Sequence, residues 1–380
     1  MVGDLAESIS AIRVIQAFAR EDASRERFRD LNAQNRDANI AATSLSYVFM
    51  PSVDFLAALA TGIVLWFGGR AVVGGTLTLG IVVAFLSYVA RFFQPVQELS
   101  QLYATLQAAT AGGERVLELL DAEPAVRDPA GARELPPIRG RVELVDVGFS
   151  YLQGVPVLKG VSLTIEPDSV VALVGKTGAG KSTIASLVAR FYDVTEGAIL
   201  VDGIDVRTVT QRSLRRQMAF VPQDPFLFSG TIADNIRFGR IEAGDAEVEA
   251  AARAARAHEF IARMPGGYAT PVLEGAANLS LGQRQLVCIA RAILVNPRIL
   301  IMDEATANID TVTESLIQEA LGRLLAGRTA LVIAHRLSTV RSASLICVVE
   351  DGRIAERGRH DELIARGGAY ARLYSQQLGG

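Results

Sequence analysis

The chain of 380 residues has only two cysteines, one tryptophan and a formal net charge of −3. Cys288 and Cys347 show no paired spacing, which argues against a disulfide scaffold or a zinc site and favours a reducing compartment. The absence of a basic excess gives no support to nucleic-acid binding. A signal-peptide pattern is also lacking, since Met1 is followed by Asp4 and Glu7 rather than by basic residues and an apolar run.

Charge is absent from two long stretches in the first third of the chain. The segment 55–69 carries no charged residue, and neither do the twenty residues 71–90. A helix needs about 20 mostly apolar residues to span the hydrocarbon core of a bilayer, and the mean hydropathy of +0.27 is high for a soluble protein. We therefore predict membrane helices at about 46–69 and 79–99, joined by a turn at 74–76. A buried helical hairpin of a soluble protein is the alternative.

Both flanks of this hairpin, 13–36 and 114–141, contain several arginines. Because basic flanks favour the cytoplasmic side, both are predicted to be cytoplasmic, in a multi-pass protein of the cell membrane. Asp54 and Arg91 are expected to face a bundle interior, water or the interface. The sequence leaves three roles for these two residues: marking a transport pathway, forming a structural ion pair, or lying at the membrane interface.

The patterns outside the hairpin suggest a division into domains. Residues 1 to about 45 have a helical composition, and helical pattern continues to residue 120. Prolines at 124, 129, 136 and 137 then predict a linker over 121–140. The expected domains are a partial transmembrane domain at 1–120 and a compact α/β domain at 141–380.

The α/β region alternates strand patterns with helical patterns, which implies a mostly parallel sheet. The stretch 231–296 shows little strand pattern and suggests an inserted helical subdomain. The expected strands are 142–147, 170–175, 199–202, 218–221, 298–302, 329–334 and 345–350, and the expected helices are about 181–191, 245–262, 283–295 and 311–325.

The stretch 175–182 fits the phosphate-loop pattern G-x-x-x-x-G-K-[ST] between an apolar strand and a helix. Glycines let successive N–H groups point at one anion, and the helix amino terminus adds partial positive charge. Lys181 would reach the β- and γ-phosphates of a nucleoside triphosphate, and the Ser182 hydroxyl would ligate Mg²⁺. The nucleotide-binding candidates in this region are Gly175, Lys176, Thr177, Gly178, Ala179, Gly180, Lys181, Ser182 and Thr183.

Two acidic residues follow the predicted strand 298–302. Ligands of open α/β sheets bind at the carboxyl ends of the strands, which would place Asp303 and Glu304 beside the phosphate loop. Asp303 is suited to hold Mg²⁺, and Glu304 is suited to polarise the attacking water as general base. Capping of the next helix is the alternative for this pair.

These motifs and their order carry a family resemblance. The stretch Leu279-Ser280-Leu281-Gly282-Gln283-Arg284-Gln285 is similar to the signature L-S-G-G-Q of ABC transporters. The whole chain resembles the second half of a half-transporter of the type IV exporter class in that family. The resemblance implies ATP as the nucleotide. It also implies an α/β P-loop NTPase fold, that of an ABC-type ATPase domain with a helical subdomain, preceded by an all-α partial transmembrane domain.

The resemblance further implies roles for single residues. In chain order, these are Tyr151 for stacking on adenine, Gln223 for the Mg²⁺ site and the membrane-domain contact, Glu274–Gly275 as the exporter X-loop, Ser280, Gly282 and Gln283 of the signature for nucleotide contact, Asp310 in the D-loop 307–310, and His335 as the switch histidine at the γ-phosphate. The expected catalytic set is Glu304, His335 and Gln223, and the expected metal set is Ser182, Gln223 and Asp303.

The chain departs from the family pattern in length. Residues 7–21 resemble a cytoplasmic coupling region and 46–99 resemble the last two of the family's six transmembrane helices. We therefore expect a fragment, whether a truncated reading frame, a gene-prediction artefact or a split subunit. Two helices cannot enclose a substrate path, so transport by this chain alone is not expected.

The second departure is Leu281, where the family signature has glycine. In the family, two ATPase domains sandwich ATP between one chain's phosphate loop and the other's signature. A β-carbon at this position restricts the backbone and would weaken contact with the partner's nucleotide. An altered signature beside an intact Glu304 favours a heterodimer with a second half-transporter slightly over a homodimer.

The function expected from the resemblance is ATP-driven export of a small molecule or lipid of hydrophobic or amphipathic character. The sequence does not identify the compound, since the family's transport cavity is built mostly from helices other than those at 46–99. The alternatives are a remnant that binds ATP without transport and a soluble ABC-type ATPase. Membrane partition of the protein separates the last of these from the others.

Overall fold

The computed structural model describes residues 2–152, 154–303, 310–334 and 336–375. The chain divides into two compact units, Met1–Glu123 and Pro124–Gly380.

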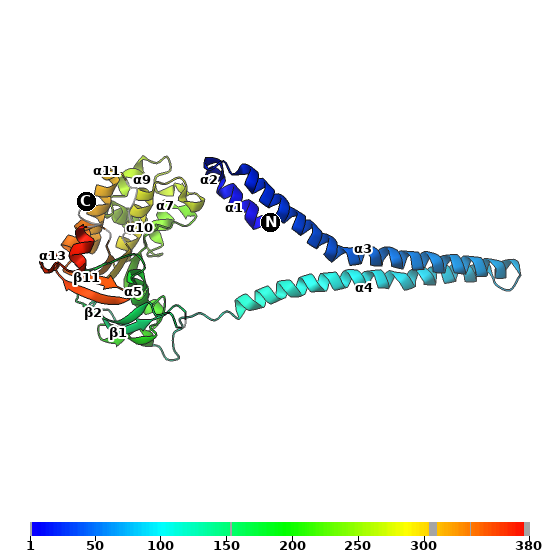
Figure 1. The fold of residues 1–380 in the computed structure, drawn as a ribbon, viewed down its shortest axis with the longest axis horizontal. Helices are drawn as coiled ribbons and strands as arrows, with labels where there is room; N and C mark the ends of the chain where they lie inside the picture. Colours follow the sequence, from blue (N-terminus) through cyan, green and yellow to red (C-terminus); the bar gives the residue numbers. More distant parts are fainter. Residues whose placement is uncertain (1, 153, 304–309, 335, 376–380) are drawn as a thin grey trace. The chain divides into compact units, whose positions relative to one another are not determined.

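The first unit is entirely helical within the residues that the structure describes. Its two long helices, of 53 and 42 residues, lie side by side as an antiparallel hairpin (Figure 1). An ion pair between Arg27 and Asp4, 3.1 Å apart, ties the first helix to the third. The helices are α1 (Val2–Ser10), α2 (Ile12–Ala17), α3 (Glu21–Val73) and α4 (Leu79–Leu120).

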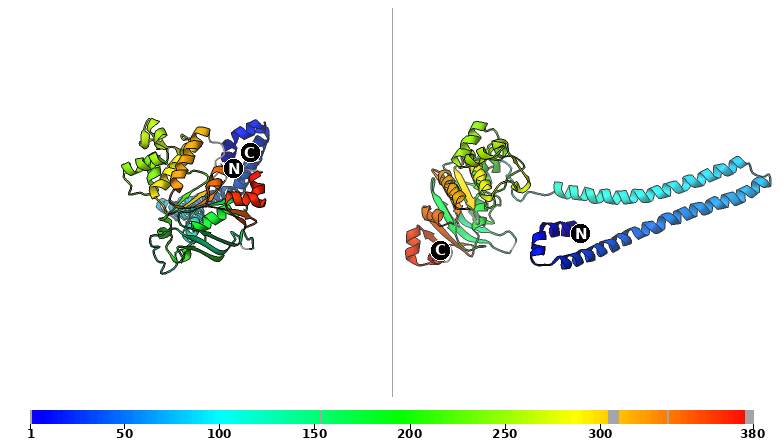
Figure 2. Two further views of the ribbon diagram at one scale, coloured as in Figure 1. Left: turned by 90° about the vertical axis from the view of Figure 1, so that its left-hand side faces the viewer. Right: turned by 90° about the horizontal axis from the view of Figure 1, so that it is seen from above.

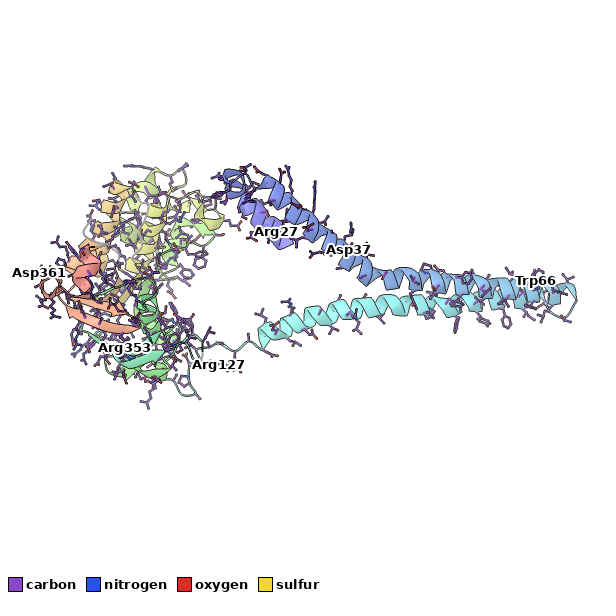
Figure 3. All side chains as sticks on the ribbon, viewed as in Figure 1. Arg27, Asp37, Trp66, Arg127, Arg353 and Asp361 are labelled. Carbon is purple, nitrogen blue, oxygen red and sulfur yellow. The ribbon has the colours of Figure 1, made fainter. Side chains whose placement is uncertain are left out.

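The outer part of the hairpin is long and apolar enough to cross a membrane twice, over Pro51–Val73 and Leu79–Val96. Gly68 allows close packing there, because a β-carbon on it would lie 3.1 Å from Val82. Trp66 lies near the turn between the two helices (Figure 3). The large apolar side chains exposed on this part include Phe55, Leu59, Ile63, Trp66, Phe67 and Phe85. Such a surface suits lipid or further helices.

The second unit contains two main sheets rather than one mostly parallel sheet. The larger has the order β12-β11-β3-β10-β9-β6, and all its neighbours are parallel except β11 and β12. The smaller, β2-β1-β4-β5, is antiparallel. The strands are β1 (Val142–Phe149), β2 (Leu158–Ile165), β3 (Val170–Val174), β4 (Glu196–Val201), β5 (Ile204–Asp205), β6 (Met218–Val221), β7 (Gly230–Thr231), β8 (Pro271–Val272), β9 (Ile299–Asp303), β10 (Thr329–Ile333), β11 (Leu345–Glu350) and β12 (Arg353–Gly358).

The predicted mostly parallel sheet corresponds to the larger sheet, but two of the predicted strands, 142–147 and 199–202, lie outside it. They are β1 and β4, which pair with each other in antiparallel register, with Val142 opposite Val201. The strand β2, which was not predicted, follows β1 after only residues 150–157. This connection is too short for the crossover that a parallel pair needs, so β2 pairs antiparallel with β1 on its other side. Without β2, the alternation of strands and helices falsely suggested a single sheet.

The parallel sheet separates two apolar cores. Along β3, Val171 and Leu173 point into one core, and Ala172 and Val174 point into the other. This alternation follows from the two-residue period of a strand, and it explains why the strand is apolar throughout. The first core is shared with β1, β2 and α5, and the second with the helices α8, α10 and α11.

Helices α7 to α10 lie together, on the side of the unit away from β1 and β2 (Figures 1 and 2). The expected helix 245–262 is two helices, α8 and α9, because the chain turns at Arg256, which has a φ of +58°. The helices of the unit are α5 (Lys181–Val188), α6 (Gln211–Arg215), α7 (Ile232–Arg237), α8 (Asp245–Ala254), α9 (His258–Arg263), α10 (Leu281–Val295), α11 (Thr311–Leu325), α12 (Leu337–Ser342), α13 (His360–Arg366) and α14 (Ala369–Leu373).

The β1–β4 pairing generates a stability prediction. Gly197 in β4 has a φ of +76°, and a β-carbon on it would lie 2.3 Å from the carbonyl oxygens of Val145 and Asp146. Gly203, in the turn between β4 and β5, has a φ of +80° but no atom within 4 Å of such a β-carbon. Gly203→Ala should cost about 1–2 kcal/mol for its left-handed backbone alone. Gly197→Ala should cost at least about 1 kcal/mol more, because it adds overpacking.

Both values are measurable from hydrogen exchange of the β1 and β4 amides in the purified chain. Equal losses for the two variants would contradict the close approach of β4 to β1.

Candidate nucleotide-binding site

The phosphate loop connects β3, in the middle of the parallel sheet, with α5. At its first residue, Gly175, φ is +151° and a β-carbon would lie 2.2 Å from the Val349 carbonyl oxygen of β11. Only glycine fits this position, because any other residue would collide with backbone that cannot move aside. The loop is thus pressed against the neighbouring strand, and its shape depends on the sheet.

Lys181, the first residue of α5, is buried and points back into the loop. Its Nζ donates hydrogen bonds to the carbonyl oxygens of Gly175, at 2.7 Å, and Lys176, at 2.8 Å. Burial lowers the pKa of Lys181 below its ordinary value, and the charge of Asp303 partly opposes this shift. A buried ammonium held this way favours a bound anion, which would restore the charge balance.

Ser182 and Asp303 meet beside the loop. The Ser182 hydroxyl donates a hydrogen bond to Oδ2 of Asp303 at 3.2 Å. Asp303 is the last residue of β9, one strand removed from β3 in the sheet. A hydroxyl and a carboxylate oxygen this close fit the oxygen ligands that Mg²⁺ prefers.

The remaining Mg²⁺ ligands would come from phosphate and water, as is usual for this ion. Ser182 and Asp303 are therefore suited to a Mg²⁺ site whose other ligands come from a bound nucleotide and water.

Tyr151 lies beside the start of α5, and its hydroxyl donates a hydrogen bond to Oγ1 of Thr183 at 3.2 Å. The ring centroids of Phe149 and Tyr192 lie 4.8 and 5.2 Å from that of Tyr151, both edge to face. Half of Tyr151 is exposed to solvent. Sequence reasoning missed Tyr192, and the only signal was its place shortly after α5, in the pair 191–192.

The signature residues form the start of α10. Ser280 is the N-cap: its Oγ accepts a hydrogen bond from the Gln283 N–H at 3.2 Å, and its own N–H donates to Oε1 of Gln283 at 2.9 Å. Leu281 is the first helical residue and Gly282 is buried. A capped amino terminus of this kind presents N–H groups and partial positive charge, which suit a phosphate.

Asp310 has a similar structural role at the start of α11. Its Oδ1 accepts a hydrogen bond from the Thr313 N–H at 2.9 Å, and this bond lowers the pKa of Asp310 below its ordinary value. The nucleotide contact expected of Asp310 stays a prediction.

The remaining candidates are located by strand register. Val221 of β6 lies opposite Met302 of β9, so Gln223, which is exposed, follows β6 at the edge where Asp303 ends β9. Ile333 of β10 lies opposite Asp303, on the other side of β9. Glu304 and His335 lie outside the described residues, as does the D-loop before Asp310.

Comparison with known proteins assigns both units. Residues 158–307 match the family described as ABC transporter, and residues 2–96 match that described as ABC transporter transmembrane region. The chain is similar to the structure of a bacterial Atm1-family ABC exporter with ATP bound, with a TM-score of 0.85 and 36% identity over 98% of this chain and 66% of that one. The chain belongs to the ABC exporter family.

Two relatives show what share of a related protein's length this ABC exporter chain spans. It is 46% identical over 373 residues to YknV, an uncharacterized ABC transporter ATP-binding protein of Bacillus subtilis (strain 168), covering 98% of this chain and 62% of that protein. It is 45% identical over 369 residues to the fatty acid ABC transporter ATP-binding/permease protein of Mycobacterium bovis (strain ATCC BAA-935 / AF2122/97), covering 97% of this chain and 58% of that protein. The chain thus spans about three fifths of the length of these relatives.

The comparisons confirm the predicted fold class, a helical transmembrane segment followed by an α/β ABC ATPase domain. The second unit is an ATPase domain of the ABC type. The roles of the individual site residues stay predictions.

Removal of the buried ammonium tests the phosphate loop. Lys181→Met should weaken ATP binding roughly 10- to 150-fold, because a hydrogen bond to a charged group contributes about 1.5–3 kcal/mol and 1.4 kcal/mol corresponds to a factor of ten. Lys159→Met is the matched control, since Lys159 is an exposed lysine of β2 outside the loop. Titration of both variants with ATP and Mg²⁺ measures the effect, and similar affinities for the two would argue against this role of Lys181.

Proposed function

We propose that this chain is the ATP-binding and permease part of an ABC exporter subunit, which couples ATP hydrolysis to export across the cell membrane. The observation that carries the proposal is the meeting of the buried Lys181, Ser182 and Asp303 at one sheet edge, in a chain that also has two helices able to span a membrane. The domain division proposed is 1–120, a linker at 121–140 and an ATPase domain at 141–380, which faces the cytoplasm.

The proposed chemistry divides binding from hydrolysis. Lys181 and the loop N–H groups would hold the β- and γ-phosphates, and Tyr151 would stack on adenine. Ser182, Gln223 and Asp303 would hold Mg²⁺, which supplies neutralisation of phosphate charge when bound. Glu304 would accept a proton from the attacking water, and His335 would contact the γ-phosphate.

The proposed assembly is a dimer with a second half-transporter. Ser280, Gly282 and Gln283 would contact the γ-phosphate of ATP held by the partner's phosphate loop, through the amino terminus of α10. Leu281, half-buried at the first position of α10, adds an isobutyl group to this terminus. We therefore favour a heterodimer whose other chain supplies an unaltered signature.

The proposed substrate is a hydrophobic or amphipathic molecule. Similar proteins include a fatty acid transporter, an ATP-dependent lipid A-core flippase of Syntrophus aciditrophicus (strain SB) that is 42% identical, and a putative multidrug export protein of Bacillus subtilis (strain 168) that is 43% identical. Their names differ in substrate at similar identity, so they support a chemical class and no single compound.

The role of Glu304 as base is tested by Glu304→Gln. Loss of the proton acceptor should lower ATP turnover by about 10²- to 10⁴-fold, the usual contribution of general-base catalysis, while ATP binding is retained. Glu242→Gln is the control, since Glu242 is exposed between α7 and α8 and has no expected site role. Phosphate release from the detergent-solubilised protein measures turnover, and undiminished release by Glu304→Gln would reject the proposed base.

The heterodimer proposal is tested by Leu281→Gly. If Leu281 weakens the contact with the partner's ATP, the purified chain alone should have low ATPase activity, and the substitution should raise it. High activity of a homodimer that Leu281→Gly leaves unchanged would count against the heterodimer.

A further inference from the structure

The segment 126–141 between the hairpin and β1 is held along the ATPase unit by a series of hydrogen bonds. The Arg133 N–H donates to the Thr208 carbonyl at 3.2 Å, and the Leu135 N–H donates to Oγ of Ser213 at 2.9 Å. Further along, the Ile138 N–H donates to Oε1 of Gln217 at 2.9 Å, and the N–H groups of Arg139 and Arg141 donate to the Asp202 carboxylate at 2.5 and 2.8 Å. We call this segment the strap.

The amino-terminal part of the strap contacts one buried arginine, Arg190. The Arg190 guanidinium donates to the carbonyl oxygen of Arg127 at 3.3 Å and lies 3.7 Å from Oδ1 of Asp128. It also donates to the Val209 carbonyl at 2.7 Å and to Oδ1 of Asp193 at 3.0 Å. Arg127 is labelled on the strap in Figure 3. Arg190 is 1% exposed, so its charge depends on these partners.

Arg190 is also the residue that ends the phosphate-loop helix. The Phe191 N–H bonds to the Ser186 carbonyl at 2.9 Å, and Arg190 has a φ of +51°, the left-handed position that glycine usually occupies after a helix. A non-glycine residue there costs about 1–2 kcal/mol. The buried contacts of its side chain offset this cost, which indicates a role for arginine that glycine could not fill.

We propose that Arg190 is a positioning residue that couples the strap to the phosphate loop. Helix α5 is a single eight-residue element, with Lys181 at one end and the turn of Arg190 immediately after the other. ATP binding restrains the Lys181 end of α5. Because the helix is rigid, the turn at Arg190 loses mobility as well, and the contact with Asp128 extends this loss of mobility to the strap. Only residues 121–125 separate the strap from α4, which leads to the membrane helices. The strap is therefore the segment through which ATP binding would affect these helices.

Two carboxylates allow a matched test, because Asp128 and Asp193 both pair with Arg190 but only Asp128 lies on the strap. Hydrogen exchange is measured on the full chain in detergent, with and without a non-hydrolysable ATP analogue and Mg²⁺. Without nucleotide, the amides of Arg133, Leu135 and Ile138 should exchange at least about 10-fold more slowly than those of 121–125.

With the analogue, strap exchange should slow by a further factor of about 3 or more in the parent chain and in Asp193→Asn, but by less than about 1.5-fold in Asp128→Asn. Arg190→Lys should behave as Asp128→Asn does. Oδ1 of Asp128 also accepts a hydrogen bond from the Gln211 N–H at 2.9 Å, and an asparagine oxygen can keep that bond. The Asp128→Asn variant is therefore expected to fold even if Arg190→Lys does not.

Two results would overturn the proposal: strap amides that exchange as fast as 121–125, or equal slowing by the analogue in Asp128→Asn and the parent. A separate titration with the analogue reports on the ATP site itself, so a failure of nucleotide binding is distinguishable from a failure of the coupling.

Discussion

The site depends on the burial of one ammonium group. Lys181 can be buried as a cation only because two loop carbonyls accept its hydrogen bonds. Those carbonyls face it because the loop leaves β3 at Gly175, where contact with β11 admits no side chain. The conformation of the loop therefore requires the assembled sheet, and the sheet requires its two apolar cores. An anion bound at the loop would relieve the cost of that burial, which links folding of the unit to its affinity for phosphate.

The parts of this site that follow from local sequence could be predicted, and the parts that follow from pairing could not. An apolar strand followed by the glycine pattern identifies the phosphate loop, and Asp303 follows from the rule that ligands bind at strand ends. The strand β2 was missed because its exposed and buried residues alternate and Gly160 interrupts the apolar pattern. Without β2, the antiparallel pairing of β1 with β4 had no signal in the sequence. Tyr192 was missed for a similar reason, since only the fold brings its ring to Tyr151.

The signature shows how one short motif can satisfy both a local and a functional requirement. Ser280 and Gln283 satisfy each other's backbone N–H groups, which is the capping box expected at any helix start. The other N–H groups of the first turn have no acceptor within the helix, as at any helix start, and a phosphate could accept hydrogen bonds from them. Leu281 does not disturb the cap, because leucine is compatible with the first helical position. Its side chain therefore affects only a ligand or partner that contacts the first turn of α10. The departure from glycine thus bears on the partner contact and leaves the fold of α10 intact.

The strap shows why composition alone is an incomplete guide to a linker. Its prolines at 129, 136 and 137 provide no backbone N–H, so they reduce the number of donors that need partners. The donors at Arg133, Leu135 and Ile138 all find acceptors on the ATPase unit, and Leu135 and Ile138 are buried in its core. A proline-rich segment can therefore be as ordered as a strand when its few donors are matched. Because a fixed segment transmits displacement and a free one absorbs it, the contacts of Arg190 with this segment decide whether events at the phosphate loop stay local.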